Sequence, residues 1–129
     1  MSRSVAVTRG IRVMVRAEYS PEHSAPQLGR WFFLYTITIR NESDVTVQLI
    51  SRHWIIEDGY GEIQEVRGPG VIGLQPVIEP GEEFEYTSAC PLPTAFGSME
   101  GSYQMITPTG ERFNTAIAKF KLQGPYTVH

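Results

Sequence analysis

Residues 11–19 read IRVMVRAEY, with apolar side chains at the odd positions and, apart from Met14, polar ones between them. Successive side chains of a β-strand point to opposite faces, so this period of two predicts a half-buried strand. Residues 31–41 and 97–105 repeat the pattern, with Phe33, Tyr35, Ile37 and Ile39 on one face and Met99, Tyr103 and Met105 on another. No stretch shows a sustained helical period, so strands dominate the prediction.

The same reasoning predicts about seven strands, at residues 11–19, 31–41, 45–57, 62–67, 84–90, 97–105 and 111–122. Within 45–57 the apolar phase changes after Leu49, which indicates either a β-bulge near Leu49–Ile50 or a crossing between sheets. Gly97 and Gly101 share the apolar face of their strand, where glycine often lets another backbone approach. The pattern predicts an all-β sandwich of two sheets, immunoglobulin- or fibronectin type III-like, with residues 1–129 as a single domain.

The charge and the cysteine content of the sequence exclude or disfavour several classes of function. The 129 residues include 11 basic and 14 acidic side chains, a net charge of −3, and the only lysines are Lys119 and Lys121. Nucleic-acid binding is disfavoured because it relies on clustered basic groups. The single cysteine, Cys90, excludes an intrachain disulfide and a zinc site that needs several cysteines. No apolar run reaches signal-peptide or membrane-span length, so we expect a cytoplasmic protein with no membrane partner.

Residues 68–73 read GPGVIG and match the pattern G-x-G-x-x-G of dinucleotide-binding folds. That motif requires a helix after the glycines, and Pro76 and Pro80 prevent one. An interstrand loop is therefore the simpler interpretation. The alternative is an anion-binding nest of backbone amides for pyrophosphate, a nucleotide or an acidic side chain. Its candidate residues are Arg67, Gly68, Gly70, Gly73 and Gln75, supported by Arg52 and Asp58, which could instead form an ion pair that braces the loop.

No catalytic constellation is recognisable. Cys90 and His53 would make a nucleophile and base only if the fold brought them together, and a buried structural thiol is the more ordinary role. The acidic clusters near Glu57 and Glu82 predict a solvated face, with Mg²⁺ coordination as the alternative, and no metal ligand or cofactor is assigned. In the run Trp31-Phe32-Phe33 at least one ring must point away from the others, so Trp31 or Phe32 is a candidate contact for a protein partner.

Several segments together resemble the ApaG family. They are Arg52-x-Trp54-x-Ile56-x-Asp58, then Gly68-x-Gly70-Val71-Ile72-Gly73-x-Gln75-Pro76, then Pro80-Gly81-x-x-Phe84-x-Tyr86-x-Ser88, and last Gly97-x-Met99-x-Gly101-x-Tyr103-x-Met105. Ala89-Cys90 departs from the more usual glycine and small residue. The resemblance implies a fibronectin type III-like sandwich and no assigned reaction. It also implies links to diadenosine tetraphosphate metabolism and to cobalt and magnesium efflux, and a protein-interaction role like that of eukaryotic relatives attached to F-box proteins and to a DNA polymerase δ-interacting protein.

Three functions remain open from the sequence. The first is a non-enzymatic interaction domain that binds an unknown protein through an exposed sheet edge and the Gly68–Gln75 loop, where a second copy could also pair to give a homodimer. The second is a sensor of a small anion or nucleotide at that loop. The third is a metal-dependent phosphohydrolase, which needs converging carboxylates that the sequence does not locate.

Overall fold

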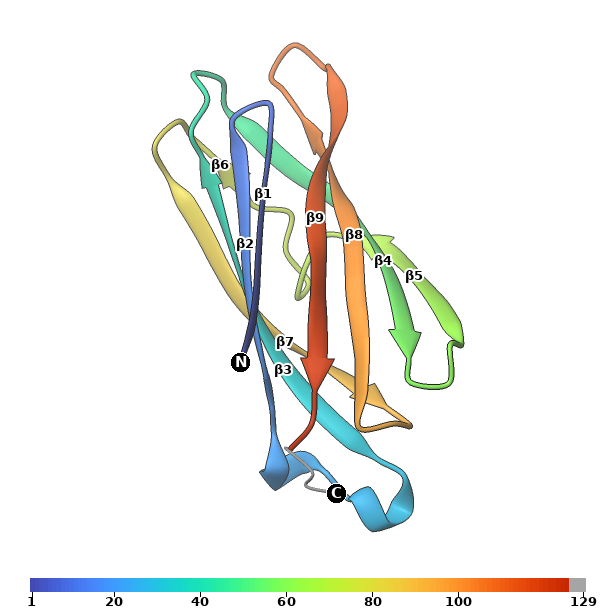
Figure 1. Cartoon of the computed structure of the whole chain (residues 1–129). Helices are drawn as coiled ribbons and strands as arrows, with labels where there is room; N and C mark the ends of the chain where they lie inside the picture. The colour runs from blue at the N-terminus through green and yellow to red at the C-terminus, as the bar shows by residue number, and fades with distance from the viewer. Residues whose placement is uncertain (126–129) are drawn as a thin grey trace.

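Residues 1–125 are described by a computed structural model, and they form nine β-strands and two single-turn 3₁₀ helices (Figure 1). The helices η1 (Pro21–His23) and η2 (Pro26–Leu28) lie in the connection between the second and third strands. The strands are β1 (Ser2–Thr8), β2 (Ile11–Tyr19), β3 (Trp31–Asn41), β4 (Val47–Asp58), β5 (Ile63–Pro69), β6 (Val77–Ile78), β7 (Glu83–Leu92), β8 (Phe96–Ile106) and β9 (Arg112–Gln123).

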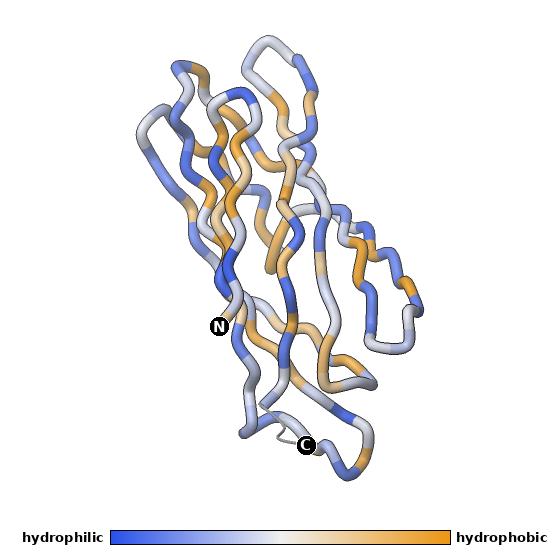
Figure 2. Tube along the Cα trace, in the orientation of Figure 1, coloured by the Kyte–Doolittle hydropathy of each residue, from blue (hydrophilic) through white to orange (hydrophobic). Residues whose placement is uncertain are grey.

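The strands form two antiparallel sheets that pack face to face. One sheet has the order β1-β2-β3-β7, and the other has the order β5-β4-β8-β9, with β6 paired to the first part of β4. Apolar and polar residues alternate along most strands (Figure 2), and the apolar sets of both sheets meet in one buried core. The predicted two-sheet all-β sandwich is therefore confirmed, and no helix among the described residues has the length and hydropathy to cross a bilayer.

The periodic positions behave as predicted. Phe33, Tyr35, Ile37 and Ile39 are buried on one face of β3, and Met99, Tyr103 and Met105 are buried on β8. The phase change in β4 is a β-bulge, because the register with β8 shifts between Leu49 and Ser51 while β4 stays in one sheet. A side chain at Gly101 would collide with the backbone carbonyl of His53, so this glycine does permit the close strand approach.

Two strands were not expected from the sequence. β6 has only two residues, and β1 inverts the usual pattern, since Val5 and Val7 are exposed while Ser4 and Thr8 face inward. The inward hydroxyls connect β1 to β9: Ser4 Oγ donates to the Ala118 carbonyl at 2.8 Å, and the Ala116 amide donates to Thr8 Oγ1 at 3.0 Å. These contacts close one lateral side of the sandwich, where the two sheet edges face each other.

The opposite lateral side lies between the edges formed by β5 and β7. The chain leaves β5 and crosses behind β8 and β9 in the view of Figure 1 to reach β6. Residues 70–76 therefore run along this side, and they are the segment in which the sequence places the glycine-rich motif. The candidate site is built around this open side.

Candidate functional site: the glycine-rich loop and the open side of the sandwich

The glycine-rich segment is a tight turn anchored in the core. The amides of Val71 and Leu74 donate to each other's carbonyl oxygens, both at 2.8 Å, and the Val71 side chain is buried in the core cluster. The turn places Ile72 and Leu74 in solvent, 56% and 50% exposed. The simpler interpretation, a tightly turned interstrand loop, therefore describes this segment.

At two positions of the motif the surrounding structure favours glycine. Gly70 has a φ of +60°, and a side chain there would collide with the Leu74 carbonyl oxygen that closes the turn. A Cβ at Gly68 would lie 2.9 Å from Nη2 of Arg52, so Gly68 leaves room for the guanidinium. The motif thus meets the needs of backbone and arginine packing without a bound phosphate.

Arg52 does brace the loop, but not through the predicted ion pair with Asp58. Its Nη1 donates to the carbonyl oxygens of Pro69 and Gly70, both at 2.9 Å. Asp58 instead accepts hydrogen bonds from the amides of Tyr60 and Glu62, at 2.8 and 3.1 Å, within the β4–β5 hairpin. The ion pair was wrong because a local Asx turn satisfies the carboxylate where it stands. Within residues 1–125 no carboxylate pairs with Arg52, so its charge lacks a counterion there.

The amides proposed for an anion nest are partly engaged already. The Gly70 amide donates to the Ile50 carbonyl at 2.8 Å, and those of Val71 and Leu74 are used in the turn. Gln75 also points back to the protein, since its Nε2 donates to the Ile50 carbonyl at 2.9 Å. An anion near this loop would therefore depend on side-chain charge more than on the loop's backbone.

Four of the predicted anion-site residues line one groove on the outer face of the five-stranded sheet. The groove has a volume of about 510 Å³, and Arg52, Arg67, Gly68 and Gln75 are among its walls, whereas Gly70, Gly73 and Asp58 are not. His53 also lines it, and its Nε2 lies 3.1 Å from Oε1 of Glu65, which in turn lies 3.9 Å from Nη2 of Arg67. The groove is therefore polar, and Arg67 contributes its exposed guanidinium group to it.

A second hollow lies between the sheets on the open side, and the sequence did not predict it. It has a volume of about 300 Å³. Its buried surface comes from Tyr35, Trp54, Cys90 and Met99, and its rim from β5 and β7. Arg52 and Ser88 are polar groups in its lining. We call this space the inter-sheet cleft.

Buried phenols lie close to the cleft. The hydroxyls of Tyr86 and Tyr103 are hydrogen-bonded to each other inside the core. Burial raises the pKa of both phenols, and the nearby Arg52 charge acts in the opposite direction. Burial also raises the pKa of Tyr35, while a hydrogen bond with Ser88 lowers it in part. These phenols are therefore neutral hydrogen-bonding groups at pH 7.

The remaining sequence candidates do not assemble into a catalytic site. His53 points outward from β4 toward Glu65, while Cys90 is buried in the other sheet, so they form no nucleophile–base pair. Burial raises the pKa of the Cys90 thiol to about 11, which keeps it protonated at neutral pH. Among residues 1–125 no three histidine, cysteine or carboxylate side chains gather as a metal site would need.

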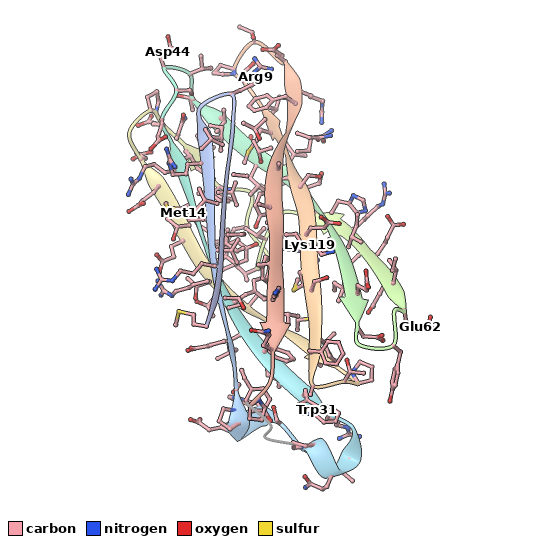
Figure 3. All side chains as sticks on the ribbon, in the orientation of Figure 1. Arg9, Met14, Trp31, Asp44, Glu62 and Lys119 are labelled. Atoms are coloured by element: carbon pink, nitrogen blue, oxygen red, sulfur yellow. The ribbon has the colours of Figure 1, made fainter. Side chains whose placement is uncertain are left out.

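Trp31 and Phe32 begin β3 at the end of the sandwich that carries the 3₁₀ helices, where Figure 3 labels Trp31. Both are half-buried. Trp31 packs against the core, and the Phe32 ring lies 5.3 Å from the His23 ring of η1. These rings lie far along the strand from the glycine-rich loop, so any partner contact they made would be a separate surface.

Comparisons with known proteins agree with this architecture. A model of the ApaG domain matches residues 21–107. Protein ApaG of Afipia carboxidovorans is 55% identical over 93% of this chain and 92% of its own length, and Protein ApaG of a Bradyrhizobium species is 56% identical over the same shares. A crystal structure of an ApaA protein from Bordetella pertussis covers 95% of this chain and 99% of its own, with 47% identity and a TM-score of 0.88.

The fold and the open-sided site therefore define a small β-sandwich domain built around a glycine-rich turn. The chain belongs to the ApaG domain family.

Proposed function

We propose that this protein is a non-enzymatic binding domain that pairs the edge of β5 with an extended segment of another protein. The observation that carries the proposal is the unpaired outer edge of β5 beside an apolar turn. β5 pairs only with β4 among the described strands, and Ile72 and Leu74 of the adjoining turn stand in solvent. An extended segment could gain main-chain hydrogen bonds from the edge and apolar contacts from the turn.

Two features of the β5 edge favour pairing with a different protein over pairing with a second copy of this chain. β5 ends at Pro69 and carries Glu65 and Arg67, and charges and proline on an edge discourage uncontrolled strand pairing. A partner segment with apolar residues and a complementary charge pattern would overcome that barrier. A homodimer through the same edge is the competing outcome of the test.

The test begins with a photo-crosslinking side chain at Ile63 on β5, in cells, and with the same group at Met14 on the opposite sheet as a control. The partner captured from Ile63 is then purified. The pair of substitutions Ile72→Glu and Leu74→Glu should weaken its binding at least about tenfold, because charges would replace the apolar contact. The matched pair Val5→Glu and Val7→Glu, at residues 53% and 49% exposed on β1, should leave binding unchanged.

Equal binding by both pairs of variants would overturn the proposal, as would the absence of a reproducible partner. Light scattering on the purified protein separates the homodimer outcome, since that outcome doubles the mass and needs no second protein. If the proposal holds, the link to cobalt and magnesium efflux that the family resemblance implies would be an indirect effect, exerted through the bound partner in the cytoplasm.

A second candidate function is binding of a small anion or nucleotide in the outer groove. Its specific support is that Arg52, Arg67, Gly68 and Gln75 line one groove with His53. Arg67 is the freest of these charges, with a side chain 72% exposed and only a 3.9 Å contact to Glu65.

The test is an amide NMR titration with pyrophosphate, ATP and diadenosine tetraphosphate, with and without Mg²⁺. Saturable shifts confined to the groove, and lost in Arg67→Ala, would support this function. Silence at millimolar ligand, or shifts that persist in Arg67→Ala, would exclude the groove as the site.

A further inference from the structure

The inter-sheet cleft holds a cation without a counterion. Arg52 lies on the core-facing side of β4, paired with Gly68 on one side and Tyr103 on the other. Its Nη1 is used by the carbonyl oxygens of Pro69 and Gly70, whereas Nε and Nη2 have no protein acceptor within residues 1–125. A half-buried guanidinium with a free donor edge is unusual, because partly desolvated charge is normally paired.

Apart from Arg52, most lining residues of the cleft are apolar or aromatic, and Gln64 and Ser88 are the other polar side chains among them. Trp54, Met99 and Tyr35 form its buried surface, and Val66 and Ile56 line it from β5 and β4. Ser88 of β7 adds one hydroxyl near the Tyr35 phenol. Its volume of about 300 Å³ is at the lower end of small-molecule sites. This combination, one cation beside an aromatic pocket, fits a ligand with one negative charge and a compact apolar body.

We propose that the inter-sheet cleft binds a small amphipathic carboxylate, such as a single-ring or short-chain acid, with its carboxylate on the free edge of Arg52 and its apolar part against Trp54, Val66 and Met99. The planar guanidinium matches a carboxylate in geometry as well as in charge. A single arginine favours a monoanion over a phosphate dianion. β5 lines the cleft, but the ligand would contact side chains such as Val66 and not the main-chain edge of β5, so the inference does not depend on the proposed partner.

The molecule contains its own reporter for this site. It has two tryptophans: Trp54 lines the cleft, while Trp31, the first residue of β3, is not among the lining residues. In a Trp31→Phe background, titration with 3-phenylpropionate should change Trp54 fluorescence saturably. The uncharged 3-phenylpropanamide has nearly the same shape, and it should bind about tenfold or more weakly, since it forms no charge-assisted pair.

Three variants locate the site. Arg52→Gln should weaken binding of the acid about 10- to 100-fold and abolish its preference over the amide. Because Arg52 also braces the loop, Val66→Phe provides an independent test: it fills the cleft, keeps Arg52, and should block both the acid and the amide. Arg67→Ala removes the neighbouring charge of the outer groove and should leave binding unchanged, with thermal melting used to verify that every variant is folded.

Equal affinity for the acid and the amide would overturn the proposal, and so would binding that survives Val66→Phe. Loss of binding in Arg67→Ala alone would assign the ligand to the outer groove and likewise reject the cleft. No saturable signal from 3-phenylpropionate, hexanoate or cyclohexylacetate at millimolar concentration would reject it as well.

Discussion

The paired phenols in the core allow a stability prediction that depends on their mutual hydrogen bond. Tyr86 and Tyr103 are 5% and 0% exposed, and within residues 1–125 each hydroxyl has the other as its hydrogen-bond partner. Replacing one tyrosine by phenylalanine removes little volume, but it leaves the other hydroxyl buried without a partner. Such an unsatisfied group costs about 1–3 kcal/mol. Tyr86→Phe and Tyr103→Phe should each destabilise the protein by about that amount.

The loss of stability in the double variant should differ from the sum of the losses in the two single variants. With both hydroxyls gone no buried polar group is left unpaired, and the two rings still fill the same space. We therefore expect the double variant to lose less than the two single losses combined, by at least about 1 kcal/mol. Urea unfolding followed by tryptophan fluorescence measures all four proteins of the cycle.

Tyr60→Phe is the matched control, because Tyr60 is 77% exposed and should change stability by less than about 0.5 kcal/mol. Strictly additive losses at Tyr86 and Tyr103 would refute the reasoning. So would a Tyr86→Phe protein as stable as the parent, since the remaining Tyr103 hydroxyl would then have found another partner.

Three further predictions test other features. Because the pKa of Cys90 is raised to about 11 in the folded state, the thiol loses its proton at lower pH in the unfolded chain than in the folded protein. This group should therefore not affect the free energy of unfolding below pH 9, and it should lower that free energy as the pH rises toward 11. In urea unfolding at alkaline pH, the stability of Cys90→Ala should fall less steeply than that of the parent protein. Gly70→Ala should cost more than Gly73→Ala: both glycines have a positive φ, worth about 1–2 kcal/mol, but only at Gly70 would the new Cβ collide with the Leu74 carbonyl, and equal thermal shifts would contradict this. Asn41→Ala should cost about 2–3 kcal/mol in chemical unfolding, because the Asn41 amide holds the Val45 and Ile78 carbonyls.

The strands that the sequence revealed are those whose apolar side chains face the core. Ile37 and Ile39 on β3 follow the period of two and are fully buried. β1 escaped detection because its burial is inverted: Val5 is exposed, while Ser4 faces inward and bonds to β9. The hydropathy pattern alone does not identify a strand whose inward side chains are hydroxyl groups that form hydrogen bonds.

The candidate site was predictable only in part, because some of its contacts leave no pattern in the sequence. The Gly68–Gly73 motif lies in the turn on the open side, and Arg52, Arg67 and Gly68 line one groove, while their role as an anion site stays a prediction. The partners of Arg52 were not predictable, because they are backbone carbonyl oxygens, which carry no signature in the sequence. The inter-sheet cleft was missed because its lining comes from five strands, β3, β4, β5, β7 and β8, that only the fold brings together.

The two lateral sides of the sandwich differ in a way that bears on function. On the β1–β9 side, Ser4 and Thr8 satisfy the backbone groups of β9 directly and leave the sheets closed. On the β5–β7 side, Val71 seals the core, but the turn around it is held by Arg52, whose guanidinium stays at the rim of a cleft. Neutral hydroxyls would have closed this side at lower electrostatic cost, because a half-buried charge is disfavoured without a partner. The carboxylate ligand proposed for the cleft would supply the counter-charge that Arg52 lacks among the described residues.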